Sequence, residues 1–157
     1  PERLVSIDEV GTDRVRLNSL TSSERRALND SWFGHFGKDA DKLRDREESV
    51  GYVAPPLDGV WATAPYFHNG SVPTLWHVLN PSERPVVWRR AATGYDDTRV
   101  GLEVETFSEV PADVRRTSER RHYFDTRRAG KSAAGHDFAD VLSADERQSL
   151  LEYLKTL

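Results

Sequence analysis

The chain has 157 residues, of which 37% are hydrophobic and 31% charged, and its formal net charge at pH 7 is −4. This length suits one unit spanning 1–157, and the negative charge argues against a general affinity for nucleic acid. The chain contains no cysteine and no methionine, which excludes disulfides, thiolate catalysis, cysteine-ligated zinc and thioether ligation of a metal. No apolar run is long enough to span a membrane, so we expect no membrane span. Because the apolar content is low, we expect a thin core that a cofactor or a partner completes.

The first fifty residues predict a short extended piece, one helix and a polar loop. A helix over 21–37 is predicted because Leu28, Trp32 and Phe36 recur every four residues and therefore share one face, which we expect to be buried. Charges of both signs alternate over 38–49, which is typical of a solvated loop or a short exposed helix.

An aromatic loop over 51–72 is the most unusual stretch of the sequence. Its prolines and glycines are too frequent for a helix or a regular strand. It is nevertheless too aromatic for a solvated linker. Such a segment typically wraps a large flat object or forms the floor of a pocket. His68 lies near its centre, and the rest of the chain can be read as its support.

The middle of the chain predicts one short helix followed by strands. Ser71 is expected to cap a helix over 73–80, in which Pro73 occupies the first turn. His77 on this helix is expected to pack or to face solvent. Weak alternation of apolar residues over 84–110 predicts a few short strands.

The last third combines a basic run, a small-residue segment and a helix. The run Arg115 to Arg121 predicts a solvated face or pairing with an anionic group. Residues 130–138 are rich in glycine and alanine and contain His136. Small residues beside a histidine let the backbone approach a bulky group closely. A helix over 143–157 is predicted by a capping box, Ser143 with Glu146, and by a leucine stripe.

Two histidines, His68 and His136, stand in settings that could carry chemistry. A zinc site needs three or four grouped ligands, and a catalytic triad needs a nucleophile elbow; neither pattern is present. The alternative for His68 is a loop histidine that bonds backbone carbonyls. The alternative for His136 is a polar residue that flanks a helix.

The run from Leu57 to Leu75 resembles the carboxy-terminal domain motif of bacterial di-haem cytochrome c peroxidases and their relatives. The fuller match, which includes Gly135-His136 and residues 150–155, resembles the rubber-oxygenase-like branch of di-haem c-type cytochromes. The resemblance covers roughly residues 7–157, and its specific parts are 51–81 and 123–157. It implies the distal half of a cytochrome c-like domain. The expected fold is mainly α, with long ordered loops and a few short β-strands.

The resemblance also implies roles for single residues. His68 is expected near the haem as the catalytic residue, and His136 is expected to be an axial ligand of the haem iron. The methionine that ligates this iron in the peroxidases has no counterpart here. Residues expected to line the cofactor are Trp61, Pro65, Tyr66, Phe67, His68 and Phe138.

Calcium is a second cofactor that the resemblance implies. Peroxidases of the group bind it between domains, partly through main-chain carbonyls. Those carbonyls correspond to Thr63 and Pro65 in this sequence.

One departure from the family is large, because a c-type haem needs a CxxCH attachment motif and this chain has none. We therefore expect the attachment motif on an upstream segment or on a second chain; the remaining alternative is a copy that has lost its haem. The first reading fits a chain that begins at Pro1 and is poor in apolar residues.

Three functions remain open at this point. The first is part of a peroxidase- or oxygenase-like oxidoreductase, exported or periplasmic, with haem c as cofactor and a redox partner protein. The second is an electron-transfer cytochrome module without catalysis. The third is a haem-free interaction domain. An upstream CxxCH separates the first two from the third.

Overall fold

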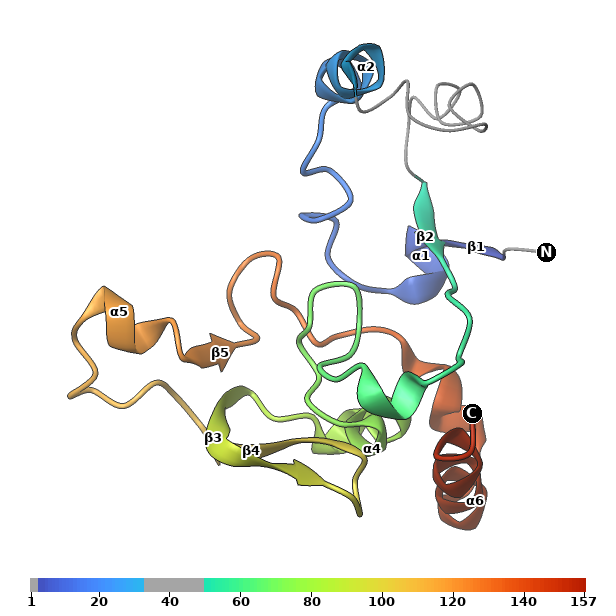
Figure 1. Cartoon of the computed structure of the whole chain (residues 1–157), viewed down its shortest axis with the longest axis vertical. Coiled ribbons are helices and arrows are strands. Elements are labelled where there is room, and N and C mark those ends of the chain that lie inside the picture. Colours follow the sequence, from blue (N-terminus) through green and yellow to red (C-terminus); the bar gives the residue numbers. More distant parts are fainter. Residues whose placement is uncertain (1–2, 33–49) are drawn as a thin grey trace.

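The computed structural model describes residues 3–32 and 50–157 (Figure 1). The end of the helix predicted over 21–37 and the charged run at 38–49 lie outside these residues. The helical elements are α1 (Ile7–Val10), α2 (Ser22–Asp30), η2 (Val60–Ala62), α4 (Leu75–Leu79), η3 (Pro81–Glu83), α5 (Thr117–Arg120), η4 (Asp137–Val141) and α6 (Ala144–Leu154). The strands are β1 (Leu4–Ser6), β2 (Gly51–Val53), β3 (Val87–Asp96), β4 (Gly101–Phe107) and β5 (Tyr123–Asp125).

The expected mainly α fold is wrong. The described residues form two antiparallel sheets besides their short helices: β1 pairs with β2, and a three-stranded sheet has the order β4-β3-β5. The predicted strands over 84–110 are present, but β3 alone spans ten residues. Polar cross-strand pairs explain the underestimate, since Arg89 lies opposite Glu105 and donates to its carboxylate at 2.7 Å. Such pairs stabilise a sheet without producing a hydrophobic alternation.

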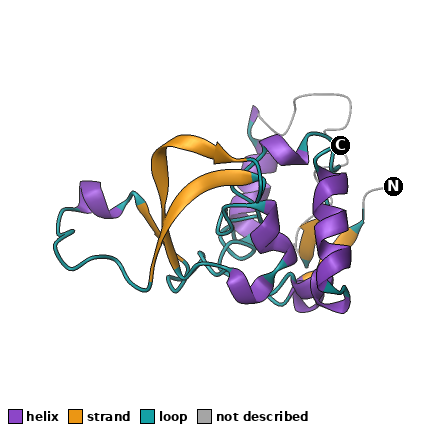
Figure 2. Cartoon of the chain, turned by 90° about the horizontal axis from the view of Figure 1, so that it is seen from below, coloured by secondary structure: helices purple, strands orange, loops and turns teal. Residues whose placement is uncertain are grey.

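The three-stranded sheet and α5 extend to one side of the other helices (Figures 1 and 2). The basic run Arg115 to Arg121 belongs to this arm, and its arginines are exposed, as expected for a solvated face. The arm is joined to the body through Trp88, whose ring nitrogen donates to the carbonyl of Ser71 at 3.0 Å.

The predicted start of the first helix is confirmed, but its predicted buried face is wrong within the described residues. Thr21 and Glu24 form a capping box at the beginning of α2. Leu28 and Trp32, however, are 50% and 63% exposed. Periodicity predicts that apolar residues share a face, whereas burial also requires a second element against that face, and α2 stands apart from the other described helices (Figure 1).

Helix α4 begins later than predicted, whereas α6 begins as predicted and ends at Leu154 rather than at residue 157. The cap of α4 is Thr74 rather than Ser71, because the chain remains extended through Pro73 and the Thr74 hydroxyl accepts from the amide of His77. At α6, Ser143 and Glu146 form the predicted capping box.

No helix among residues 3–32 and 50–157 has both the length and the apolar character to cross a membrane.

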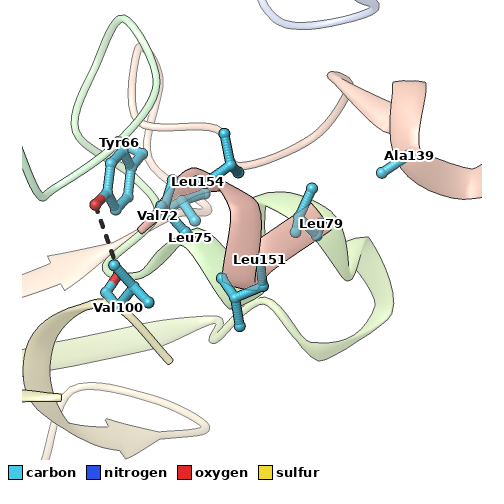
Figure 3. Close-up of a cluster of buried hydrophobic side chains, with 8 residues drawn as sticks. All are labelled: Tyr66, Val72, Leu75, Leu79, Val100, Ala139, Leu151 and Leu154. Carbon is cyan, nitrogen blue, oxygen red and sulfur yellow. Dashed lines mark hydrogen bonds between the residues drawn. The ribbon is translucent and has the colours of Figure 1, made fainter. Parts of the chain in front are cut away.

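One apolar core joins the aromatic loop to α4, η4 and α6 (Figure 3). Its buried members are Tyr66, Val72, Leu75, Leu79, Val100, Ala139, Leu151 and Leu154. The hydroxyl of Tyr66 donates to the carbonyl of Val60 at 3.0 Å and lies 3.5 Å from that of Val100. The core therefore holds both ends of the loop that carries His68.

Candidate functional site

The tip of the aromatic loop carries His68 on a rigid base. Tyr66 and Val72 close the loop through an antiparallel bridge, in which the amide of Tyr66 donates to the carbonyl of Val72 at 2.7 Å. Both residues belong to the core. Gly70 turns the chain at φ 69°, a conformation that glycine adopts at little cost.

Asn69 ties this tip to the segment that precedes His136. Its side-chain amide donates to the carbonyl of Ser132 at 2.8 Å and to that of Gly130 at 3.4 Å. Its oxygen accepts from the amide of Ser71 at 3.1 Å. One side chain thus connects two stretches that are about sixty residues apart in sequence.

The backbone around His136 is pressed against α1. The amide of His136 donates to the carbonyl of Val10 at 2.7 Å. A Cβ on Gly135 would lie 2.3 Å from the same carbonyl oxygen, so only glycine fits there. His136 itself has φ 58°, in the left-handed region that disfavours residues with a Cβ. The fold holds His136 in this strained backbone conformation, which fixes the position from which its side chain extends.

Four aromatic rings form a continuous stack, here called the ring stack: Tyr52, His68, His136 and Phe67. The ring of Tyr52 stacks on that of His68 with centroids 4.2 Å apart and an angle of 19°. His68 and His136 follow at 5.4 Å and 24°, and His136 and Phe67 at 3.9 Å and 12°. The guanidinium of Arg84 lies 4.9 Å from the Phe67 centroid and ends the column. His136 is therefore sandwiched between Phe67 and His68.

The ring stack contains buried polar atoms without a hydrogen-bond partner among the described residues. They are both ring nitrogens of His68, Nδ1 of His136 and the hydroxyl of Tyr52. Buried polar groups are almost always hydrogen-bonded, and an unpartnered one costs about 1–3 kcal/mol. Four such atoms in one stack indicate a place where a further group binds.

Burial keeps both histidines of the stack neutral. It lowers the pKa of His136 to about 4; the neighbouring His68 adds to the effect, and the backbone of Ala134 opposes it. Burial also lowers the pKa of His68, and Arg16 acts in the same direction. Each imidazole therefore keeps a lone pair at neutral pH, and the neutral ring is the form that ligates a metal.

Of the predicted site residues, the structure brings Phe67, His68 and His136 together and leaves the others elsewhere. Tyr66 lies in the core rather than in the stack. Trp61 and Phe138 are 45% and 54% exposed. Pro65 is exposed as well, so these residues do not line the stack.

Two residues of this site were missed by the sequence analysis, Tyr52 and Arg84. Tyr52 lies on β2, whose pairing with β1 places its ring against His68. Arg84 follows η3 and stood in a run without any motif. The sequence marks these two residues only weakly: Tyr52 is an aromatic residue at the start of the loop, and Arg84 directly precedes Pro85.

The structure gives no support for the calcium prediction. No group of three or more histidine, aspartate or glutamate side chains within 3–32 and 50–157 could hold a metal ion. Thr63 is exposed, and its hydroxyl donates to the carbonyl of Val60 at 3.0 Å. Calcium bound through the main-chain carbonyls of Thr63 and Pro65 stays a prediction from the resemblance.

Two clefts of the described residues lie outside the ring stack. The larger, about 650 Å³, borders α2 and is lined by residues such as Leu17 and Arg25. The smaller, about 370 Å³, is lined by Arg84, Gly135 and Asp137 and reaches the backbone that carries His136. The rings of His68 and His136 line neither, so the unpartnered atoms mark the site more directly than cavity volume does.

Comparison with known proteins confirms the resemblance over the aromatic loop. Residues 51–89 match the model of the RoxA-like, cytochrome c-like family. This segment contains Tyr52, Phe67, His68 and Arg84. The chain therefore carries a RoxA-like cytochrome c segment, which suggests a c-type cytochrome, and the cofactor that this family implies is haem c.

Two curated proteins of Sinorhizobium fredii (strain NGR234) are similar to this chain, both described as uncharacterized. The protein y4iM is 40% identical over 133 residues, which is 76% of this chain and 30% of the relative. The protein y4iJ is 38% identical over 118 residues, or 69% of this chain and 18% of the relative. This chain thus spans less than a third of the length of either relative.

Proposed function

We propose that this chain supplies an axial ligand and the protein cover of a c-type haem. It would serve electron transfer in an exported or periplasmic oxidoreductase of the peroxidase- or oxygenase-like kind. The observation that carries the proposal is the cluster of unpartnered polar atoms in the ring stack. The family match over residues 51–89 supplies the identity of the expected cofactor.

The ring stack has the donor chemistry that a haem iron requires. A neutral histidine nitrogen is a common axial ligand of haem iron, and both His68 and His136 are neutral and have buried nitrogens without partners. Their rings stack at 5.4 Å, so the two imidazoles lie side by side rather than on opposite faces of one iron. Only one of them is therefore assigned to the iron. We assign His136, in agreement with the resemblance.

The neighbours of His136 orient it and keep water away. Phe67 and His68 cover its two faces, which limits rotation of the imidazole about its side-chain bonds. Tyr52 covers the outer face of His68 in turn. His68 keeps both nitrogens free to exchange hydrogen bonds with a haem propionate or with a bound oxygen species. Such neighbours tune the basicity of an axial ligand and the potential of its metal.

A bound haem would supply the one-electron redox chemistry. Its attachment cysteines must come from another segment or another chain, because this sequence contains no cysteine. The relatives are more than three times as long as the matched stretch, which leaves room for such a segment. If the attachment motif supplied a second imidazole to the iron that His136 ligates, no coordination position would stay open. Such a haem would serve electron transfer rather than oxygen binding.

The decisive experiment is an absorption spectrum of the intact natural protein that contains this sequence, produced in a host with c-type cytochrome maturation. We expect a Soret band and a low-spin ferric spectrum. The variant His136→Ala should shift the spectrum to a high-spin form, since the iron would lose its axial imidazole.

The matched control is His122→Ala, because His122 is exposed and lies on the arm, away from the stack. It should leave the spectrum unchanged. Absence of a Soret band would reject haem binding and favour a haem-free interaction domain. A Soret band that His136→Ala does not alter would reject the ligand assignment alone.

A further inference from the structure

Arg84 is a buried cation at the end of the ring stack. Its side chain is only 6% exposed, although an isolated buried charge is costly. Burial lowers the pKa of this guanidinium, and Asp137 partly offsets the effect. Asp137 is itself 54% exposed and lies 3.3 Å away, so it is a weak partner. The rest of the compensation must come from neutral acceptors.

Most of those acceptors are backbone carbonyls on the segment around His136. Nη1 of Arg84 donates to the carbonyl of Gly135 at 2.6 Å and to that of Ala133 at 2.7 Å. Nη2 lies 3.4 Å from the carbonyl oxygen of His136 itself. Together with Asp137, four positions of this five-residue stretch bond to one side chain.

The remaining donors reach the end of α4. Nε of Arg84 donates to the carbonyl of His77 at 3.0 Å, and Nη2 lies 3.4 Å from that of Val78. These carbonyls belong to the last turn of the helix, where backbone acceptors have no partner within the helix. The guanidinium therefore joins a helix end in the core to the segment that carries His136.

Arg84 also contacts the stack directly. Its guanidinium lies over the ring of Phe67, at 4.9 Å from the centroid, and the same ring stacks on that of His136. One side chain thus touches both the backbone of His136 and the ring that covers its imidazole.

We propose that Arg84 is the positioning residue of the site: it clamps residues 133–137 onto the end of α4 and so fixes the orientation of His136. The relevance of this clamp to haem ligation rests on the proposed function; the clamp itself is a property of the chain alone. Lysine could not replace it, because an ammonium has three donors and no planar fork, whereas Arg84 serves six acceptors on two segments.

The chain offers a matched control in Arg147. Its Nε donates to the carbonyl of Ala139 at 3.1 Å, and its Nη1 donates to the side chain of Asn80 at 3.3 Å. Its side chain is 19% exposed, and like Arg84 it joins the end of α4 to a neighbouring segment. Its partners lie beyond 133–137, so its loss should lower stability without releasing His136.

The experiment compares Arg84→Gln, Arg84→Lys and Arg147→Gln by two readouts. The first is amide hydrogen exchange in the haem-free chain. For both Arg84 variants we expect exchange of the His136 amide to accelerate by about tenfold or more relative to the amides of α6. For Arg147→Gln we expect no such selective acceleration. The lysine variant keeps the charge and supplies the result should the glutamine variant fail to fold.

The second readout is the ferric absorption spectrum of the intact haem-bearing protein. The Arg84 variants should show a mixed low-spin and high-spin spectrum that added imidazole returns to low spin. Arg147→Gln should remain low-spin. Uniform acceleration of exchange in all three variants, or unchanged exchange at His136 in the Arg84 variants, would overturn the clamp. A wild-type protein without a Soret band would reject the haem proposal, while the exchange result would still decide the clamp.

Discussion

His77, which is buried, and His136, which is half-buried, differ in the hydrogen bonding of their ring nitrogens. Burial lowers the pKa of both to about 4. His77, in the last turns of α4, has Nδ1 2.7 Å from the hydroxyl of Thr74, whereas Nδ1 of His136 is buried without a partner. A lowered pKa therefore does not by itself mark a binding site. The unpartnered nitrogen is what distinguishes a binding site from a packed core.

Local structure explains the difference. Thr74 caps α4 three residues before His77, so the helix itself supplies the hydrogen-bond partner. His136 follows two alanines and a glycine in a left-handed turn, and the neighbours on either face of its ring are Phe67 and His68. Among these, no side chain is bonded to its Nδ1, so a partner for it must come from outside the described residues.

The largest expected effect concerns the partnered histidine. His77→Ala should lower the free energy of unfolding by about 2–4 kcal/mol, because it removes a side chain from a site that is 3% exposed and leaves the Thr74 hydroxyl without its partner. Urea unfolding of the haem-free chain measures this. Thr74→Ser keeps the oxygen and should cost less than His77→Ala. A loss below 0.5 kcal/mol for His77→Ala would contradict the view that His77 is a structural residue.

The next effect is a pH dependence of stability due to His77. Its pKa is about 4 in the folded chain, chiefly through burial and then through Arg99, and near 6.5 when unfolded. Between these values the unfolded chain binds a proton that the folded chain does not. The contribution of His77 is therefore complete above pH 6.5 and falls, by on the order of 2 kcal/mol, as the pH drops toward 4.

Comparison of wild type with His77→Gln isolates this contribution from the carboxylates that titrate in the same range. Urea unfolding at pH 7.5, 5.5 and 4.5 should show a shallower decline for the variant. Parallel declines in the two proteins would mean that folding does not lower the pKa of His77, in contrast to the pKa of His136.

How much of this site the sequence predicts depends on the range of the interactions. The capping box of Ser143 and Glu146 is local, and it was predicted correctly. The importance of His68 and His136 came from the unusual composition of their segments and from the resemblance. The stacking of His68 on Tyr52 and the bonds from Arg84 to residues 133–137 connect positions 16 to about 50 residues apart, and no local pattern encodes them.

The errors have a similar origin. The aromatic loop was correctly singled out, but composition does not tell which face of a loop each ring occupies. Trp61, which is expected at the cofactor, donates from its ring nitrogen to the carbonyl of Leu157 at 3.0 Å and is 45% exposed, outside the ring stack. Its contact with a haem stays a prediction. The length of β3 was underestimated because cross-strand pairing between arginine and glutamate leaves no apolar alternation.

The smallest effect is also the most direct test of the comparison. His68→Phe should raise the free energy of unfolding of the haem-free chain by about 1 kcal/mol, because it removes two unpartnered nitrogens and keeps a ring between Tyr52 and His136. Tyr52→Phe removes one unpartnered hydroxyl and should act in the same direction. Urea unfolding at pH 7.5 measures both variants.

A clear loss of stability in His68→Phe would show that these nitrogens are already bonded within the chain. His68 would then resemble His77, and the stack would be a core rather than a site. A gain in stability would mean that the unpartnered nitrogens of His68 destabilise the haem-free chain. That is expected of a residue that is retained to interact with a bound group.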